Sequence, residues 1–209
     1  MFTCDKWIAS SHSKSIIGKE IVVIVLEDKE FWAQCQFIVK ISEPLVHVLR
    51  LVDGDEKPAM GYLYDAMERP KENIKARCNN KDSIFSPFTR FIDSRWDKQL
   101  HSLLHAAGCL LNPKIFYSPS FKKNDVVRGF NCYVMKMKLD PDDQDKIIAE
   151  LDLYNNVVGE FRHSLAICQR DKLNPIAWWT QFGCEVPTLQ RFVVRVLSQY
   201  CSATGCERN

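Results

Sequence analysis

Two histidines in the middle of the chain have a spacing that suits metal binding. His101 and His105 are four residues apart, so a helix would place both imidazoles on one face. Ser102 stands where a zinc-binding His-Glu-x-x-His motif carries glutamate, and no third ligand lies nearby in the sequence. Leucines and alanines surround the pair. We therefore expect two structural histidines rather than a metal site.

Other residues that could take part in catalysis have simpler explanations at helix ends. The acidic run Asp140–Asp145 superficially resembles a calcium-binding loop, but it lacks that loop's glycine, and a helix N-terminus accounts for its acids. Ser198 has no histidine close to it in the sequence, so a hydrolase triad has no support. Thr204 and Glu207 have the spacing of a capping box, in which the carboxylate accepts a hydrogen bond from a backbone amide. The residues themselves predict no catalytic site.

The cysteines indicate the redox environment. Nine cysteines lie at wide, irregular spacings, and none belongs to a Cys-x-x-Cys pair. Their odd number, together with the lack of a secretory signal pattern, predicts reduced and mostly buried thiols in a reducing compartment. No apolar run approaches the roughly 20 residues of a membrane-spanning helix, so we expect no membrane association.

Composition and charge limit the classes of protein. The 209 residues are 46% hydrophobic and 11% aromatic, which is enough for a packed core. The 28 Lys and Arg side chains against 26 Asp and Glu give a net charge of +2, too balanced for a chain that mainly coats nucleic acid. A local basic stretch consists of Lys122, Lys123, Arg128, Lys136 and Lys138. Its interruption by Asp125 and Asp140 favours an ordinary solvated face.

Apolar side chains recur mainly every three or four residues, which is the period of a helix. One such stripe predicts a long helix over 29–52, kinked near Pro44 because proline lacks the backbone donor. The β-branched run 19–26 fits either a short strand or the first turns of a buried helix. Similar patterns predict helices over 57–75 and, whole or broken, over 85–111.

The carboxyl-terminal third contains clear helix starts. Asp140-Pro141 and Asn174-Pro175 each combine a capping side chain with proline at the first helical position, and Pro187 opens the last helix. Within the second of these helices, Trp178 and Trp179 lie about 100° apart around the axis. Either that helix is enclosed on two sides, or one indole contacts a partner chain, where tryptophan is enriched.

The combination of these motifs resembles the hAT superfamily of transposases, plant-type members in particular. The segment from Asn174 to Ser198 carries the paired tryptophans, a proline and leucine opening the next helix, and a Leu-Ser exit, and small residues then lead to Glu207-Arg208-Asn209. Upstream, residues 43–54 contain Glu-Pro-Leu-Val and Leu-Arg-Leu-Val-Asp-Gly, and residues 95–113 contain Arg-Trp-Asp and Leu-Asn-Pro. The resemblance covers residues 17–209.

This resemblance implies a fold and a division of the chain. The expected fold is mainly α: a helical insertion domain plus the C-terminal helices of an RNase-H-like transposase core, with the core strands largely missing. Residues 1–16 would form a polar lead-in, 17–158 the insertion-like helical region and 159–209 the C-terminal dimerisation region. Because members of the family have further segments on both sides of these regions, we expect the chain to be truncated at both ends.

The resemblance also bears on catalysis. Intact members cut and join DNA with divalent ions that two aspartates and one glutamate hold. Glu207 matches the glutamate, while no residue of this chain matches the aspartates. One carboxylate cannot hold a two-metal site. We therefore expect no autonomous transposase activity and no cofactor, the divalent metal belonging only to the intact parent family.

The function that the resemblance implies is protein dimerisation in the nucleus, with a second copy or another hAT-derived protein as partner. The expected interface consists of Trp178, Trp179, Pro187, Leu189, Phe192, Val193, Val196 and Leu197. The same apolar stripe could instead pack inside the chain. Two other functions remain open: a DNA-binding helical domain that uses the basic stretch, and an inert truncated reading frame.

Overall fold

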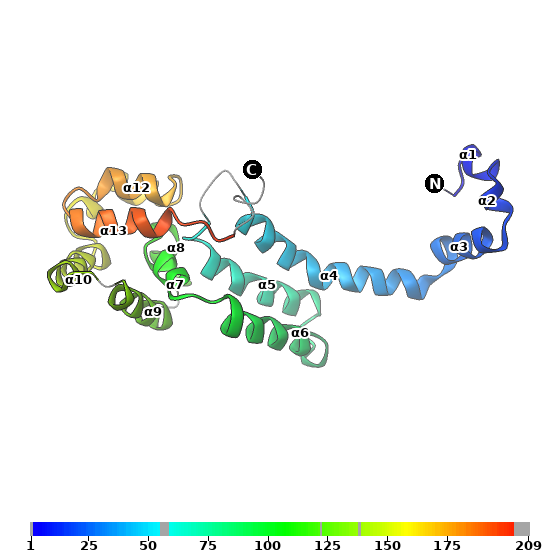
Figure 1. Ribbon diagram of the computed structural model, residues 1–209, viewed down its shortest axis with the longest axis horizontal. Helices are drawn as coiled ribbons and strands as arrows, with labels where there is room; N and C mark the ends of the chain where they lie inside the picture. The colour runs from blue at the N-terminus through cyan, green and yellow to red at the C-terminus, as the bar shows by residue number, and fades with distance from the viewer. Residues whose placement is uncertain (1, 55–58, 122, 138, 203–209) are drawn as a thin grey trace. The chain divides into compact units, whose positions relative to one another are not determined.

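The computed structural model describes residues 2–54, 59–121, 123–137 and 139–202 of the chain (Figure 1). Within these ranges all regular structure is helical and no strand occurs, which confirms the mainly α prediction. The relation to an RNase-H-like core stays a prediction. The chain divides into two compact units, Met1–Glu43 and Pro44–Asn209, and each is described by itself.

The first unit consists of short helices and the start of a long one. It contains α1 (Asp5–Ile8), α2 (Ser11–Lys14), α3 (Ile16–Glu27) and the first part of α4 (Lys29–Val52). Side-chain oxygens cap these helices: Ser15 Oγ accepts a hydrogen bond from the Gly18 amide at 3.0 Å, and Asp28 Oδ1 accepts one from the Phe31 amide at 2.9 Å. At the joint between α3 and α4, the Trp32 indole donates to the Val25 carbonyl at 2.7 Å.

Helix α3 corrects one prediction. The run 19–26 is neither a strand nor part of a buried helix: it lies inside α3, and Gly18 is the only buried residue of that helix. The Ser15 cap starts a helix that β-branched residues then continue, because their strand preference is weak when no neighbouring strand is present to pair with. Helix α4 has the predicted bounds and continues through Pro44. The kink near Pro44 stays a prediction.

After the end of α4, the second unit continues with two helices that contact each other and then with a broken helix. The two helices are α5 (Leu63–Arg77) and α6 (Asp82–Arg95), joined by a turn in which Asn79 and Asn80 adopt positive φ angles of 54° and 57°. A π-helical turn, Trp96–Leu100, follows directly, and α7 (Leu103–Leu110) starts after it at the cap residue Ser102. The helix predicted over 85–111 is thus the broken one of the two alternatives.

The rest of the second unit consists of short helices around α7. In chain order they are α8 (Pro113–Phe116), α9 (Lys123–Lys136), α10 (Pro141–Asn155), a 3-10 turn (Gly159–Arg162), α11 (Ser164–Gln169), α12 (Pro175–Phe182) and α13 (Pro187–Leu197). The starts predicted from capping residues and prolines at α10, α12 and α13 are confirmed. Helix α9 and the four- to six-residue helices α8 and α11 were not predicted.

Helix α7 lies at the centre of the core. It packs against α5, α8, α9 and α13, and six of its eight residues are buried. Helices α7 and α9 approach each other closely at Gly129, where a Cβ would come within 2.6 Å of Ala106 Cβ. The segment before α5 approaches α7 equally closely, since a Cβ at Gly108 would come within 2.5 Å of the Met60 carbonyl oxygen. The core therefore joins segments that are far apart in the sequence, and the C-terminal helices complete it.

Candidate functional site

The C-terminal helices are positioned by caps at their N-termini. Asn174 Oδ1 accepts a hydrogen bond from the Ile176 amide at 2.9 Å, which starts α12. Helix α13 has no such cap of its own, because Val186 occupies its N-cap position. Instead, Glu150 Oε2 of α10 accepts a hydrogen bond from the Leu189 amide at 2.6 Å. A carboxylate at this end of a helix also offsets the partial positive charge there, so Glu150 fastens α13 to α10.

Both tryptophans of α12 are completely buried, with an exposed fraction of 0% each. The Trp178 indole donates a hydrogen bond to the Ala166 carbonyl at 2.8 Å, and the Trp179 indole donates one to the Leu111 carbonyl at 2.7 Å. Their rings pack edge to face against each other, with centroids 5.6 Å apart, in one aromatic cluster: Trp178 stacks on Phe161, with centroids 5.5 Å apart, and Trp179 lies 4.7 Å from the Tyr154 ring centroid. Both indoles are thus buried by their own chain, as the first of the two alternatives requires, although the opposite face of α12 is exposed at Ala177, Thr180 and Gln181.

The apolar stripe of α13 is buried in the same core. Helix α13 packs against α7, α10 and α12, and five of its side chains lie in the core cluster: Leu189, Phe192, Val193, Val196 and Leu197. These side chains, like Trp178 and Trp179, therefore lie inside the described chain, which is the alternative in which the stripe packs within its own core. Only Pro187 of the predicted interface set is exposed. Contacts of the buried residues with another chain would require this core to open, so their part in dimerisation stays a prediction.

The surface of the C-terminal region has other apolar side chains. On α11, Leu165 is 63% exposed and Ile167 45% exposed, and Cys168 is exposed one turn after Leu165. Below them, Ala166 is fully buried and its carbonyl oxygen holds Trp178. The outer face of α11 thus carries exposed apolar side chains, and its inner face is fixed to the core through Ala166. Sequence reasoning missed this face, because a six-residue helix is too short for a periodic pattern to show which side is buried.

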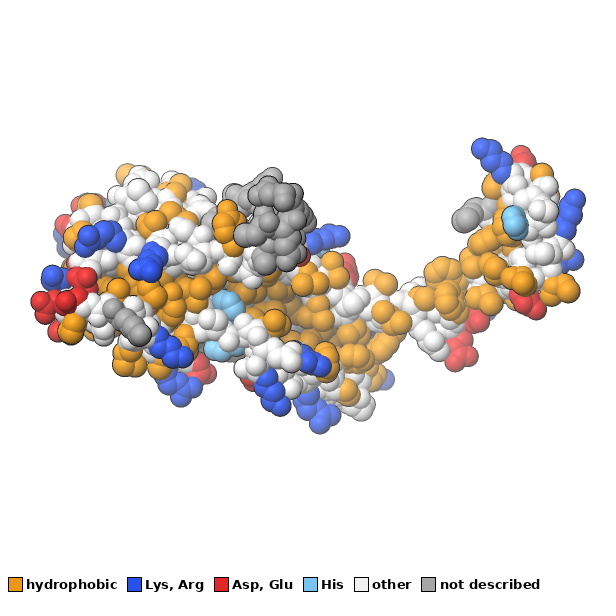
Figure 2. Space-filling model, in the orientation of Figure 1, with side chains coloured by type: hydrophobic (Ala, Val, Ile, Leu, Met, Phe, Trp, Pro, Cys, Tyr) orange, Lys and Arg blue, Asp and Glu red, His pale blue; other side chains and the backbone are white. Residues whose placement is uncertain are grey.

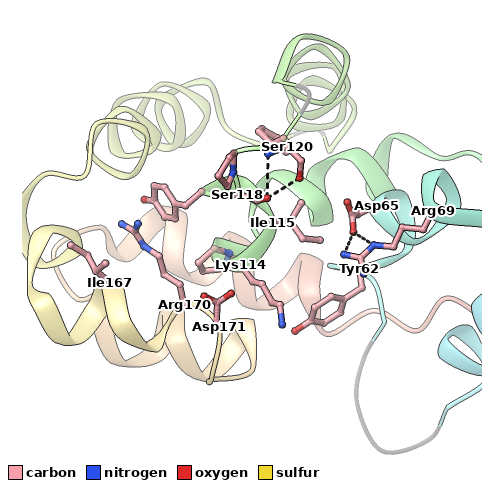
Figure 3. Close-up of a pocket in the computed structure, with 14 residues that line it drawn as sticks. Tyr62, Asp65, Arg69, Lys114, Ile115, Ser118, Ser120, Ile167, Arg170 and Asp171 are labelled. Atoms are coloured by element: carbon pink, nitrogen blue, oxygen red, sulfur yellow. Dashed lines mark hydrogen bonds and ion pairs between the residues drawn. The ribbon is translucent and has the colours of Figure 1, made fainter. Parts of the chain in front are cut away.

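A cavity of about 410 Å³ lies beside α11 (Figure 3). Tyr62, Asp65 and Arg69 line one side of it, and Arg170 and Asp171, just after α11, line the other. Arg69 pairs with Asp65 at 2.8 Å, so this side carries no excess charge. The cavity combines both signs of charge with tyrosines and serines, and no single class of ligand fits it better than another.

Besides lining the cavity, Arg170 packs against an aromatic ring of the core. Its guanidinium lies over the Tyr117 ring, with Cζ 3.4 Å from the ring centroid. The Tyr117 hydroxyl donates a hydrogen bond to the Tyr154 carbonyl at 2.6 Å, and burial raises the pKa of Tyr117 well above its usual value. Tyr154 itself is fully buried and stacks against Phe116. This group connects α8, α10 and the end of α11.

The histidine pair has a structural role at His105. The His105 Nδ1 atom accepts a hydrogen bond from the Ser102 amide at 3.2 Å, which completes a capping box at the start of α7, and the imidazole stacks on Trp96. Burial and, to a smaller extent, the nearby His101 lower the pKa of His105 to about 4. Among the described residues, no group of three or more His, Cys, Asp or Glu side chains could hold a metal ion.

Several predicted site residues lie partly or wholly outside the described residues. Thr204 and Glu207 are among them, as are Lys122 and Lys138 of the basic stretch, and the side chain of Lys123 is not described either. Of the remaining basic residues, Lys136 is exposed, and Arg128 pairs with Asp125 at 3.1 Å. The described part of the basic stretch therefore forms no continuous positive surface.

The described cysteines, residues 4–201, form no disulfide. Burial raises the pKa of Cys109 to about 12, while Cys4, Cys168 and Cys184 are exposed. Within the described ranges, no helix is both long enough and apolar enough to span a bilayer.

One comparison with known proteins identifies part of the chain. Residues 154–209 match the family model of the hAT family C-terminal dimerisation region. The matched segment starts at Tyr154, in the aromatic cluster, and includes α11, α12 and α13. No protein of curated function and no solved structure matches the chain. The match supports the resemblance to the hAT family and indicates a role in protein dimerisation for this region.

Proposed function

We propose that this chain is a hAT-derived protein that associates with a second copy of itself in the nucleus and has no autonomous transposase activity. The match of residues 154–209 to the hAT dimerisation region carries the proposal. The described core adds a restriction on how the region can associate. Since α12 and α13 fill the interior of their own chain, a partner would contact the outer face of the region.

The outer face of α11 is the part of this region best suited to such a contact. Leu165 and Ile167 are exposed and flank Ala166, which the core holds through the hydrogen bond from Trp178. Apolar side chains on a rigid support lose little freedom on binding, so they favour association. We expect Leu165, with Cys168 beside it, to lie at the centre of the contact.

The lack of autonomous transposase activity rests on the donor set. The two-metal reaction of the family needs several carboxylates around the ions, and only Glu207 has a counterpart in the family's motif. The described residues offer no three-ligand group that fits such ions. We therefore derive no catalytic step for this chain.

Light scattering of the full chain over a dilution series tests the proposal. We expect a dimer that dissociates on dilution, and we expect Leu165→Asp to raise the dissociation constant at least about tenfold, because a charge would then be buried against apolar surface. Ile148→Asp is the matched control: Ile148 is 46% exposed on α10, outside the matched segment, and its substitution should leave the dimer intact.

Two results would overturn the proposal. One is a wild-type chain that stays monomeric at every concentration. The other is an equal effect of Leu165→Asp and Ile148→Asp while the circular dichroism of both variants remains that of the wild type. Phe192→Asp is not a suitable probe, because Phe192 is buried and the variant should unfold rather than release folded monomers.

A further inference from the structure

Helix α3 exposes far more apolar surface than a helix in water normally does. Eight of its twelve residues are Ile, Val or Leu, and none of these eight side chains is buried. Figure 2 shows hydrophobic side chains over the face of α3 in view. The least covered of them are Ile16, Ile17 and Leu26, which are 77%, 69% and 55% exposed. Contiguous apolar surface of this kind indicates a contact site.

Two of the three charged side chains of α3, Lys19 and Glu27, lie along one face, and the third is Glu20. Residues four apart on a helix lie above one another, so Lys19, Val23 and Glu27 share a face, with the basic side chain first, the apolar one in the middle and the acidic one last. All three are exposed. An open apolar groove of about 490 Å³ runs along this side, between Ile16, Lys19, Glu20, Val23 and Ile24.

We propose that α3 pairs with α3 of a second copy in an antiparallel arrangement, with Val23 on the two-fold axis. A two-fold axis at residue 23 places residue 19 opposite residue 27 of the other copy. Each Lys19 then lies beside a Glu27 of the partner copy, and the pair occurs twice by symmetry. A parallel arrangement would oppose like charges instead, so the order of charges selects the antiparallel one.

The composition of the first unit disfavours a lipid surface as the occupant of this face. Within residues 1–43 there are five lysines, no arginine and six Asp or Glu residues. Anionic membranes attract helices that carry an excess of basic side chains, and this unit has none. A second copy, in contrast, supplies both the apolar face and the matching charges.

The length of α3 limits the affinity expected of the contact between two copies. Twelve residues of helix span about 18 Å, which is less than a standard interface requires. We therefore expect a weak contact, with a dissociation constant in the micromolar range or above. This contact is separate from the proposed association through α11, so each of the two can exist without the other.

Disulfide trapping in the full chain tests the arrangement. Val23→Cys would place two thiols side by side at the axis, whereas Ile21→Cys, on another face and similarly exposed, is the matched control; Val23 is 51% and Ile21 42% exposed. In both variants the exposed Cys4, Cys168 and Cys184 are replaced by serine. With oxidised glutathione as oxidant, we expect the covalent dimer of Val23→Cys to form at least about tenfold faster. Equal rates for the two variants would overturn the proposal.

Charge reversal provides a second test that the association through α11 does not affect. We expect Lys19→Glu and Glu27→Lys each to slow trapping at Val23→Cys by about threefold to tenfold, and the double variant to restore it, because the pairs are then re-formed with opposite sense. Absence of restoration would reject the antiparallel pairing. Leu165→Asp should leave trapping unchanged, so failure of one proposal does not imply failure of the other.

Discussion

Replacement of Trp179 by phenylalanine tests whether this indole is buried in its own chain or contacts a partner chain. The variant keeps an aromatic ring next to Tyr154 but removes the donor to the Leu111 carbonyl, a bond of 2.7 Å between fully buried residues. The missing ring atoms leave a small cavity, which costs roughly 1 kcal/mol. The unpaired buried carbonyl costs about 1–3 kcal/mol more. Together these terms lower the free energy of unfolding by about 2–4 kcal/mol.

Urea denaturation followed by far-ultraviolet circular dichroism measures this change. With a slope of about 2 kcal/mol per molar urea, the middle of the usual range, the midpoint should fall by about 1–2 M. Trp32→Phe is the matched control: its indole also donates to a carbonyl, that of Val25, but it is 45% exposed, so water replaces the lost bond and the midpoint should hardly move. Several protein concentrations are needed, because dimerisation contributes to apparent stability.

A different outcome would refute the reasoning from burial. If Trp179→Phe and Trp32→Phe had the same small effect on the midpoint, while light scattering showed that only Trp179→Phe had lost the dimer, the indole would face a partner. The core described around α12 would then be wrong.

Three further predictions concern individual contacts. Glu150→Ala should lower the free energy of unfolding by about 1 kcal/mol, measured by urea denaturation, because the Leu189 amide loses its cap; a result equal to wild type would contradict that role. The pKa of His105 is lowered from 6.5 to about 4, so between these pH values only the unfolded chain takes up this proton. The free energy of unfolding should therefore fall as the pH is lowered from 6.5 to 4, and His105→Gln should flatten this dependence on pH, measured by urea unfolding. An unchanged pH dependence would contradict the prediction. Burial raises the pKa of Cys109 to about 12, whereas Cys168 is exposed. Iodoacetamide at about pH 8 should therefore modify Cys168 at least about tenfold faster than Cys109, as measured by peptide mass spectrometry. Equal rates for the two thiols would show that Cys109 is accessible.

Local signals in the sequence predicted most of the longer helices but not the contacts that these helices make with one another. The bounds of α4 and the starts of α10, α12 and α13 follow from one apolar stripe and from capping residues beside prolines, both of which act within a few residues. The π-helical turn Trp96–Leu100 has no such signal. Its first residue, Trp96, stacks on His105 of the next helix, a contact that a local pattern does not reveal.

The candidate site was harder to predict because its burial depends on distant residues. Sequence alone left Trp178 and Trp179 between core and interface, since the residues that enclose them, Leu111, Tyr154 and Phe161, come from other elements. The opposite error occurred at α3, where a long apolar run led us to expect burial and the described unit supplies no cover. Apolar content predicts that a segment needs a partner, and only the fold shows whether the chain provides one.

The matched dimerisation region depends on the helices that precede it. Trp179 bonds to Leu111 at the end of α7, Leu189 receives its cap from α10, and α13 packs on α7. A fragment limited to residues 154–209 would lose all three contacts and leave the Trp179 indole without its hydrogen-bond acceptor and the α13 stripe without the cover of α7 and α10. Such a fragment would associate through surface that the whole chain keeps inside, and its self-association would say nothing about the outer face of α11. The interface of this protein must therefore be determined on the full chain. There the apolar residues of α12 and α13 are buried in the core, so they contribute to folding and are not available for association.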